Sequence, residues 1–188
     1  AKNSAIGSRY FTTKSIQNFK AIMPSGSLKE VVKATILKTR EELLTLGSAK
    51  DRRLYDFACT SIFMFYSFFE NEARIVIANI GDGRGGIKVG NANWKALFTP
   101  TKGDEANSTI FLTSDSALQE LHITELGYTE TNQLSVVLVT DGIENQAFEV
   151  LVKEDDKLID PNRPFANFLD PCVDAISSWH NKGWKPAQ

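Results

Sequence analysis

The hydrophobic pattern of the first quarter of the chain predicts two amphipathic helices. Apolar residues recur at helical spacing from residue 6 to residue 22, and MPSG at 23–26 ends this first pattern. Ser27 and Glu30 have the spacing of a capping box, which predicts that a second helix begins there. The second helix is predicted to end at Gly47. Because each helix has one apolar side, each is expected to pack that side against other apolar surface.

The middle of the chain has the pattern of short β-strands. β-branched and aromatic residues fill 59–69, and residues 73–80 alternate in part between apolar and polar. Because only a short polar joint separates these two segments, ENE at 70–72, they are predicted to pair as an antiparallel hairpin. Residues 134–139 are almost wholly apolar, which predicts a central strand that is covered on both faces. Further short strands are predicted at 87–89, 94–97, 110–112 and 121–124.

After residue 142 the pattern becomes helical again. Helices are predicted at 144–152 and near 165–179, separated by a polar loop at 154–157. Helices, then short antiparallel strands, then helices indicate an α+β fold in which helices stack on the faces of sheets. No internal repeat and no low-complexity linker divides the chain, so we expect residues 1–188 to form a single domain.

The composition narrows the class of protein. The 188 residues are 42% hydrophobic and 23% charged, which excludes collagen-like, mucin-like and wholly disordered chains. Lys and Arg number 21 against 23 Asp and Glu, so a net charge of -2 gives no electrostatic reason to expect a nucleic acid or an anionic membrane as partner. The longest apolar run, 62–69, is far shorter than the roughly 20 residues of a membrane span.

The two cysteines, Cys59 and Cys172, lie far apart in the sequence. They form no CxxC motif and no Cys/His cluster, which argues against structural zinc. A single disulfide is the alternative, but reduced, buried thiols in a cytoplasmic protein are the favoured interpretation.

Two aspartates, Asp82 and Asp141, are candidates for a functional site. Asp82 lies in a glycine-rich run, GDGRGG at 81–86, and a strand rather than a helix is predicted to follow. This order disfavours a phosphate-binding loop and favours a tight hairpin turn with Asp82 exposed. Asp141 follows the apolar strand and could hold Mg²⁺ or Mn²⁺, but on local features the cap of the following helix is favoured. His122 and His180 have no partners that would suggest a catalytic triad.

Four segments, taken in their order along the chain, carry a family resemblance. VIANIGDGR at 76–84 is similar to an N-x-GDSR strand and turn, and VLVTDGI at 137–143 is similar to an SDG strand end. Between them stand WKALFTP at 94–100 and GDEANSTIFLT at 103–113. Together these segments resemble the metal-dependent protein phosphatases, the type 2C-like (PPM) family, in a bacterial branch. The resemblance extends from Ala1 to about Trp179.

This resemblance implies a fold, an activity and two metal ligands. The fold would be an αββα sandwich, two stacked antiparallel β-sheets flanked by helices. The activity would be hydrolysis of phosphoserine and phosphothreonine in proteins by a hydroxide that bridges two Mn²⁺ or Mg²⁺ ions. Asp141 matches the aspartate that binds a core metal, and Asp82 matches one that helps to hold a third, weaker metal. Asn145 stands where the family often has another aspartate, so a third ion is expected to bind weakly or not at all.

The resemblance also implies that parts of the family pattern lie outside residues 1–188. An Asp-Gly-x-Gly strand would precede a segment like residues 1–8, and an acidic pair would follow near Gln188. We therefore expect a domain that is incomplete at both ends, lacks its terminal strands with bare sheet edges, and is inactive by itself. The implied partners are a phosphoprotein substrate and a cognate Ser/Thr kinase in bacterial signalling. The alternatives are a non-catalytic phosphatase-like module that binds a kinase or ligand, and an unrelated α+β scaffold.

Overall fold

The computed structural model describes residues 4–23, 27–49, 57–69, 72–101, 109–129 and 134–183. Contacts divide the chain into two compact units. Unit 1 comprises Ala1–Gly83 and Pro100–Thr131, and unit 2 comprises Arg84–Thr99 and Asn132–Gln188. Each unit has its own sheet and its own apolar cluster. The single domain stays a prediction, and the predicted joints at 24–26 and 70–71 and the 103–108 stretch lie outside the described residues.

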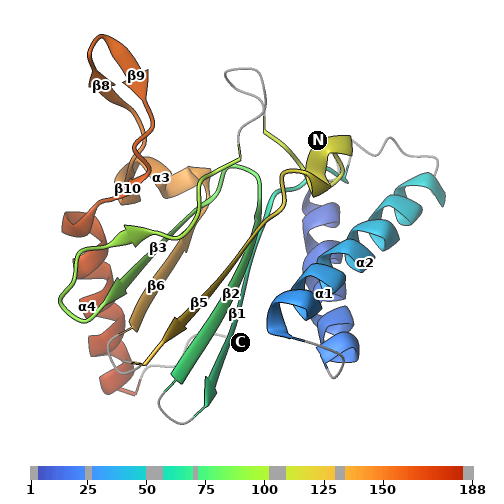
Figure 1. Ribbon diagram of the computed structural model, residues 1–188, viewed down its shortest axis with the longest axis horizontal. Coiled ribbons are helices and arrows are strands. Elements are labelled where there is room, and N and C mark those ends of the chain that lie inside the picture. The colour runs from blue at the N-terminus through green and yellow to red at the C-terminus, as the bar shows by residue number, and fades with distance from the viewer. Residues whose placement is uncertain are drawn as a thin grey trace. The chain divides into compact units, whose positions relative to one another are not determined.

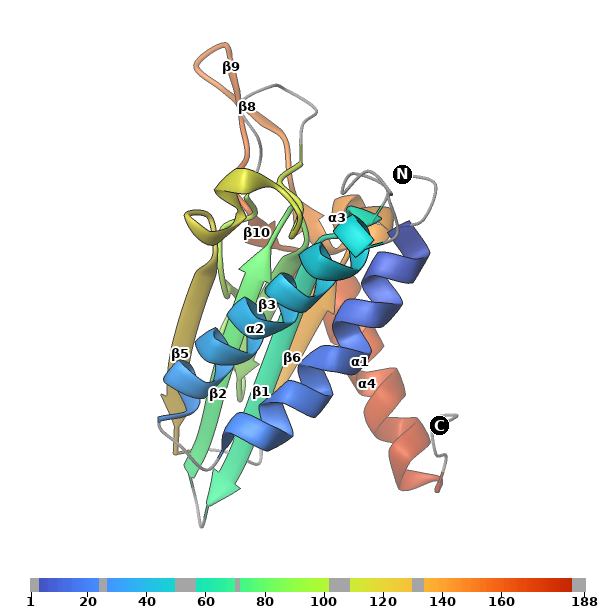
Figure 2. The same ribbon diagram turned by 90° about the vertical axis from the view of Figure 1, so that its right-hand side faces the viewer.

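Unit 1 consists of two helices on one face of a three-stranded antiparallel sheet. The helices are α1 (Ser4–Ile22) and α2 (Leu28–Ala49), and the sheet has the order β1-β2-β5. Figure 2 shows both helices lying over this sheet. The strands are β1 (Ser61–Phe69), β2 (Glu72–Ile80) and β5 (His122–Tyr128), and a short 3₁₀ helix, η3 (Asp115–Leu118), precedes β5. The predicted hairpin is confirmed, since β1 and β2 pair from Ser61–Ile80 to Phe69–Glu72.

The predicted capping box forms at the start of α2. The backbone N–H of Ser27 donates to Glu30 Oε2 at 3.1 Å, and the Ser27 hydroxyl donates to the same oxygen at 2.9 Å. These hydrogen bonds, the side-chain one first, hold the pKa of Glu30 below its usual range. The predicted end at Gly47 is wrong, because α2 continues to Ala49. A glycine inside a helix costs only about 1 kcal/mol relative to alanine, so the buried Gly47 does not force an end.

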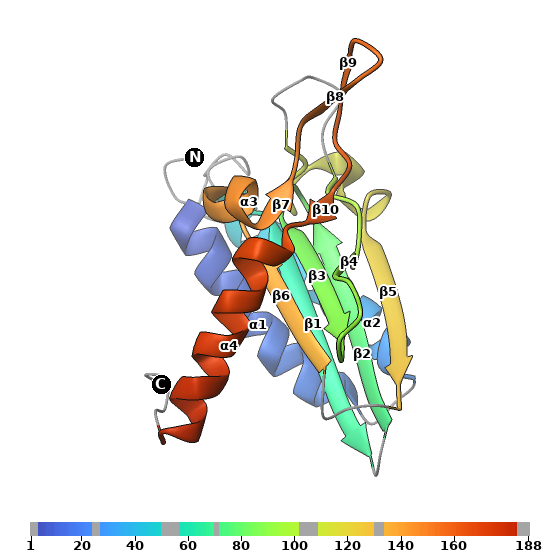
Figure 3. The same cartoon turned by 90° about the vertical axis from the view of Figure 1, so that its left-hand side faces the viewer.

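Unit 2 is built around a second antiparallel sheet with the order β4-β3-β6. Its strands are β3 (Arg84–Val89), β4 (Lys95–Ala96) and β6 (Leu134–Val139). After β6 come α3 (Asp141–Ala147), β7 (Phe148–Glu149), the hairpin of β8 (Val152–Glu154) and β9 (Lys157–Ile159), β10 (Arg163–Pro164) and α4 (Ala166–Asn181). Figures 1 and 3 show this order. An apolar cluster joins β6, α3, β7 and α4 through Trp94, Val139, Ala147, Phe148 and Leu169.

The glycine-rich run differs from the predicted hairpin turn. Strands β2 and β3 pair with different partners, so the short link between them leads from one sheet to another. Within the run, Gly81 alone has a positive φ, 107°, and Gly85 and Gly86 lie inside β3. A Cβ on Gly85 would stand 2.7 Å from a ring carbon of Phe98. Glycine is therefore needed at residue 85 for close packing rather than for a turn.

Three further expectations are wrong in detail. Residues 134–139 were expected to form a central strand, but among the described strands β6 pairs only with β3 and lies at the sheet edge. The prediction is wrong because an apolar run indicates that the faces of a strand are covered and does not specify how many strands pair with it. The helix expected at 144–152 begins at Asp141 and ends at Ala147, where the extended backbone of Phe148 leads into β7. The strand expected at 110–112 is absent from the described residues, where only Thr109 forms an isolated bridge.

The fold class is α+β with antiparallel sheets, as predicted. Helices and strands both contribute, and every described ladder is antiparallel. Among the described helices, none combines the length and the apolar composition that a membrane crossing requires.

Candidate functional site

Asp141 stands at the junction between β6 and α3 in unit 2. It is the first residue of the helix and is exposed. The N-cap of α3 is Thr140, so the favoured interpretation of Asp141 as a helix cap is wrong. The carboxylate makes no side-chain hydrogen bond to another described residue, and a negative charge in the first turn of a helix is electrostatically favourable. Asp141 is thus a solvent-accessible carboxylate two residues after the end of a paired strand.

Asp82 occupies the link after β2 in unit 1, and its neighbours hold it. The Thr109 hydroxyl donates a hydrogen bond to Asp82 Oδ2 at 3.0 Å. The preceding carbonyl, that of Gly81, accepts from the Thr101 N–H at 2.8 Å and from Asn79 Nδ2 at 3.4 Å. Asp82 is half-buried rather than exposed, because of these contacts on both sides of the turn. Asp82 and Asp141 belong to different units.

The guanidinium of Arg84 is the centre of a charged cluster in unit 2. Arg84 is 1% exposed. Its Nη1 and Nη2 donate to the two carboxylate oxygens of Asp160, at 3.0 and 2.6 Å, which is a bidentate pair. Its Nε donates to Glu144 Oε2 at 2.9 Å, and Nη1 also donates to Asn162 Oδ1 at 2.8 Å. We call Arg84, Glu144, Asp160 and Asn162 the Arg84 cluster.

Local sequence explains how the segment after β9 reaches Arg84. Asp155 and Asp156, with φ of 46° and 63°, form the two-residue turn that reverses the β8–β9 hairpin. Asn162 also has a positive φ, 46°, which asparagine tolerates, and its N–H donates to Asp160 Oδ1 at 3.0 Å. Its side-chain Nδ2 donates to the Phe98 carbonyl at 2.8 Å. The turn therefore holds two acceptors toward one guanidinium.

The electrostatics of the cluster favour a charged Arg84. Burial by itself would lower the pKa of Arg84, but hydrogen bonds and charges from Asp160 and Glu144 outweigh burial and raise it. The guanidinium also lies 6.0 Å from the centre of the Phe148 ring, within cation–π range. The two carboxylates keep about a fifth of their side-chain surface exposed. Arg84 is thus a fixed cation that neutralises acidic side chains from two separate segments.

A second charged cluster lies on α4. Asp170 Oδ1 accepts hydrogen bonds from Lys88 Nζ and from Trp94 Nε1, both at 2.8 Å. These bonds, that of Lys88 first, hold the pKa of Asp170 below its usual range. A polar hollow of about 500 Å³ beside the pair is lined by Lys88, Gly90, Asn91, Leu134, Ser135, Asp170, Val173, Asp174 and Ser177. The ion pair between Asp170 and Lys88 therefore connects α4 to β3.

The donor chemistry of the predicted site suits a hard divalent cation. Carboxylate oxygens are the ligands that Mg²⁺ and Mn²⁺ prefer, and Asp141 and Asp82 each supply one carboxylate. No group of three or more His, Cys, Asp or Glu side chains able to hold a metal occurs among the described residues. Each carboxylate therefore fits such an ion in kind, and a metal site at either aspartate stays a prediction. The carboxylates of Glu144 and Asp160 form ion pairs with Arg84.

Sequence reasoning missed the Arg84 cluster. In the sequence, Arg84 is only the last residue of a motif, and its partners lie 60 to 78 residues further along the chain. One local signal was available, since Glu144 lies one helical turn after Asp141. The thiols are free, as predicted, but only Cys59 is buried and Cys172 is exposed. Burial raises the pKa of Cys59 to about 11, so this thiol is a poor nucleophile at neutral pH.

Comparisons with known proteins agree with the motifs. A family model, that of protein phosphatase 2C, matches residues 1–183. Serine/threonine-protein phosphatase 3 of Escherichia coli (strain K12) is 28% identical over 144 residues, which cover 76% of this chain and 50% of that protein. The chain thus spans about half the length of this curated relative. No solved structure matches significantly. Because the family model covers nearly the whole sequence, the chain belongs to the protein phosphatase 2C family.

Proposed function

We propose that the protein carrying this chain hydrolyses phosphoserine and phosphothreonine in other proteins with the help of Mn²⁺ or Mg²⁺. The observation that carries the proposal is the exposed carboxylate of Asp141 at the end of a paired strand, in a chain of the protein phosphatase 2C family. Bound divalent ions would supply a water of lowered pKa and would neutralise negative charge on the phosphoryl oxygens.

Asp141 and Asp82 have different proposed roles. Asp141 would bind a core metal, and its exposure leaves the carboxylate available to an ion that other carboxylates also hold. Asp82 would bind a weaker third ion, and the hydrogen bond from Thr109 would keep its carboxylate in one orientation. Asn145 is exposed on α3, and its neutral amide adds no charge that would strengthen a third site.

The substrate would be a phosphoprotein. A cognate serine/threonine kinase would phosphorylate that protein, and the kinase and the phosphatase would act as a pair in signalling. The curated relative is named a serine/threonine-protein phosphatase, which supports this substrate class. The two free thiols support action in a reducing compartment such as the cytoplasm. Residues 1–188 supply two matching carboxylates, so we expect this stretch alone to bind the metal pair poorly and to be inactive.

The test is phosphate release by the full-length protein from phosphothreonine, phosphoserine and phosphotyrosine peptides of one sequence. With Mn²⁺ or Mg²⁺ present, we expect turnover of the first two peptides, and a chelator should abolish it. Absence of metal-dependent release, together with retained binding of a kinase or small ligand, would favour the non-catalytic module instead. Equal turnover by residues 1–188 and by the full-length protein would contradict the expected inactivity of the shorter chain.

A further inference from the structure

We propose that Glu144 and Arg84 are positioning residues of the metal site, because their ion pair fixes the first turn of α3 and thereby the place of Asp141. The inference rests on the proposed function, in which Asp141 binds a core metal. Neither residue is expected to touch the ion itself. Glu144 Oε2 and Arg84 Nε are joined at 2.9 Å within unit 2.

Helix α3 needs an external contact to hold its N-terminal turn. It has only seven residues, far fewer than the roughly 12–15 at which an isolated helix becomes even marginally stable. Its one buried residue, Ala147, lies at the opposite end from Asp141. Gly142 lowers helix propensity, and the Thr140 side chain makes no cap hydrogen bond. Tertiary contacts must therefore set the position of the first turn.

Glu144 supplies such a contact. Residues 141–143 are exposed, and the side chain of Ile143 is 48% exposed, so these residues bury little apolar surface. Glu144 is the first residue of α3 that is partly buried, and its carboxylate reaches a guanidinium that is itself 1% exposed. A charge-assisted hydrogen bond to a buried partner restricts the helix more strongly than an exposed ion pair would.

Arg84 contacts the junction between β6 and α3 on both sides of Asp141. Its backbone is the pairing partner of Val139, two residues before Asp141, and its side chain holds Glu144, three residues after it. The bidentate pair with Asp160 and the bond to Asn162 keep the guanidinium in one orientation. The carboxylate of Asp141 is thus carried on a short segment that is bonded to Arg84 on both sides, to its backbone at Val139 and to its side chain at Glu144.

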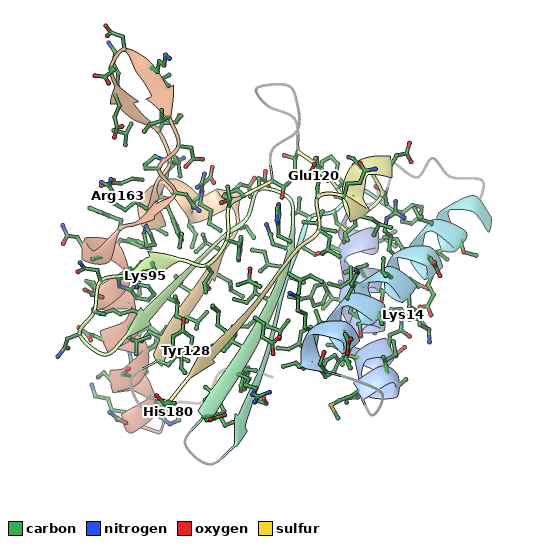
Figure 4. All side chains as sticks on the ribbon, in the orientation of Figure 1. Lys14, Lys95, Glu120, Tyr128, Arg163 and His180 are labelled. Atoms are coloured by element: carbon green, nitrogen blue, oxygen red, sulfur yellow. The ribbon has the colours of Figure 1, made fainter. Side chains whose placement is uncertain are left out.

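The experiment compares Mn²⁺ binding by variants of the full-length protein. Glu144→Ala removes the ion pair without lowering helix propensity, and Glu144→Gln keeps the length and one acceptor oxygen. Glu149→Ala is the matched control, because Glu149 accepts from Arg163 Nη1 at the same 2.9 Å in an exposed pair of the same unit. Figure 4 labels Arg163, on β10. Calorimetry gives the Mn²⁺ dissociation constant, and amide hydrogen exchange of the metal-free protein gives the protection of α3.

Glu144→Ala is expected to weaken Mn²⁺ binding roughly tenfold, the lower end of the range for residues that orient a metal ligand. Glu144→Gln should fall between Glu144→Ala and the unchanged protein, and α3 amides should lose protection in the same order. Turnover at saturating Mn²⁺ should be largely retained, because the pair acts on metal binding rather than on the chemical step. Glu149→Ala should leave all three quantities unchanged.

Three results would overturn the inference, and they are distinguishable. If Asp141→Asn weakens Mn²⁺ binding and Glu144→Ala does not, the positioning role is wrong and the proposed function stands. If Asp141→Asn leaves Mn²⁺ binding unchanged, the assignment of Asp141 fails and the positioning role fails with it. A merely structural role for Glu144 would lower the denaturant midpoint while the folded variant keeps the original dissociation constant, which also counts against the inference.

Discussion

Arg84 and Glu144, sixty residues apart in the sequence, are joined by a 2.9 Å hydrogen bond from Nε to Oε2. Arg84 closes the segment that is similar to the N-x-GDSR motif, and Glu144 directly follows the segment that is similar to the SDG strand end. Two of the four segments that carry the family resemblance are therefore connected by the β3–β6 ladder and, through Glu144 directly after the second of them, by side chains. Through this connection, Arg84 contacts the chain on both sides of Asp141, although it lies 57 residues before Asp141 in the sequence.

Removing the Arg84 guanidinium should destabilise unit 2. In Arg84→Met, Asp160 and Glu144 lose their counter-ion, and the free energy of unfolding is expected to fall by roughly 3 kcal/mol, the lower end for a broken buried ion pair. The lower end applies because both carboxylates keep some exposure to water. Urea unfolding of the full-length protein measures the change. Arg163→Met breaks an exposed pair and should change the free energy by about 0.5 kcal/mol or less.

Gly85 should not tolerate even a methyl group. In Gly85→Ala the new Cβ would lie 2.7 Å from Phe98 Cε1 and 3.1 Å from Leu138 Cδ2, so buried side chains or the strand must shift. We expect a loss of about 1–3 kcal/mol, the usual effect of overpacking. Gly127→Ala in β5 is the control, because a Cβ there meets nothing within 4 Å. Thermal unfolding that finds the two variants equally stable would contradict the close packing at residue 85.

The contribution of Asp170 to stability should depend on pH. Lys88 and Trp94 hold its pKa below the ordinary value of 3.8 in the folded protein, so the folded state binds this proton less readily than the unfolded state. The stabilisation is therefore fully present above that ordinary value and is lost as the pH falls through the lower, folded pKa. Asp170→Asn should be less stable than the unchanged protein at pH 7, about three units above that value, and the difference should shrink in strong acid.

Urea titrations at neutral and acidic pH check this dependence. Asp174→Asn alters an exposed aspartate of the same helix that accepts no hydrogen bond from another described side chain, and it should leave the free energy of unfolding at neutral pH unchanged. A difference between Asp170→Asn and the unchanged protein that stays constant into strong acid would contradict the role of the charged carboxylate.

The capping box at the start of α2 should contribute measurably to stability. Ser27→Ala removes the hydroxyl that donates to Glu30 and that accepts from the Glu30 N–H at 3.4 Å. The expected loss is about 1 kcal/mol, the usual value for an N-cap serine. Thr45→Ala, which removes an exposed hydroxyl bonded to the Glu41 carbonyl in the same helix, is the control and should have little effect. Thermal unfolding with no difference between the two variants would count against the capping box.

Local patterns predicted the elements whose causes are local. The capping box at Ser27 and Glu30 forms because both partners lie within one helical turn. The β1–β2 hairpin forms from two adjacent apolar segments that pair along their whole length. The last predicted helix differs from α4 by only a residue or two at each end, since its apolar face repeats at helical spacing. In each case the residues that determine the element are neighbours in the sequence.

Pairing between distant segments could not be predicted in this way. Strands β2 and β3 are separated by three residues, yet β2 pairs with β1 and β5 while β3 pairs with β4 and β6. The sequence near Gly81 contains no signal for this change of sheet. Likewise, the place of Asp141 followed from the end of an apolar run, whereas its connection to Arg84 depends on a register between β3 and β6. Electrostatic partners at such distances become visible only in the folded chain.

The most direct measurement is the Mn²⁺ dependence of phosphothreonine-peptide hydrolysis by Asp141→Asn in the full-length protein, beside Asp174→Asn as control. If Asp141 binds a core metal, its neutral isostere should lower turnover at fixed Mn²⁺ by at least about a hundredfold, beyond the roughly 10–100-fold of orienting residues, and should weaken Mn²⁺ binding. Asp174→Asn should behave as the unchanged protein. Retention of the original turnover and Mn²⁺ affinity in Asp141→Asn would contradict the account.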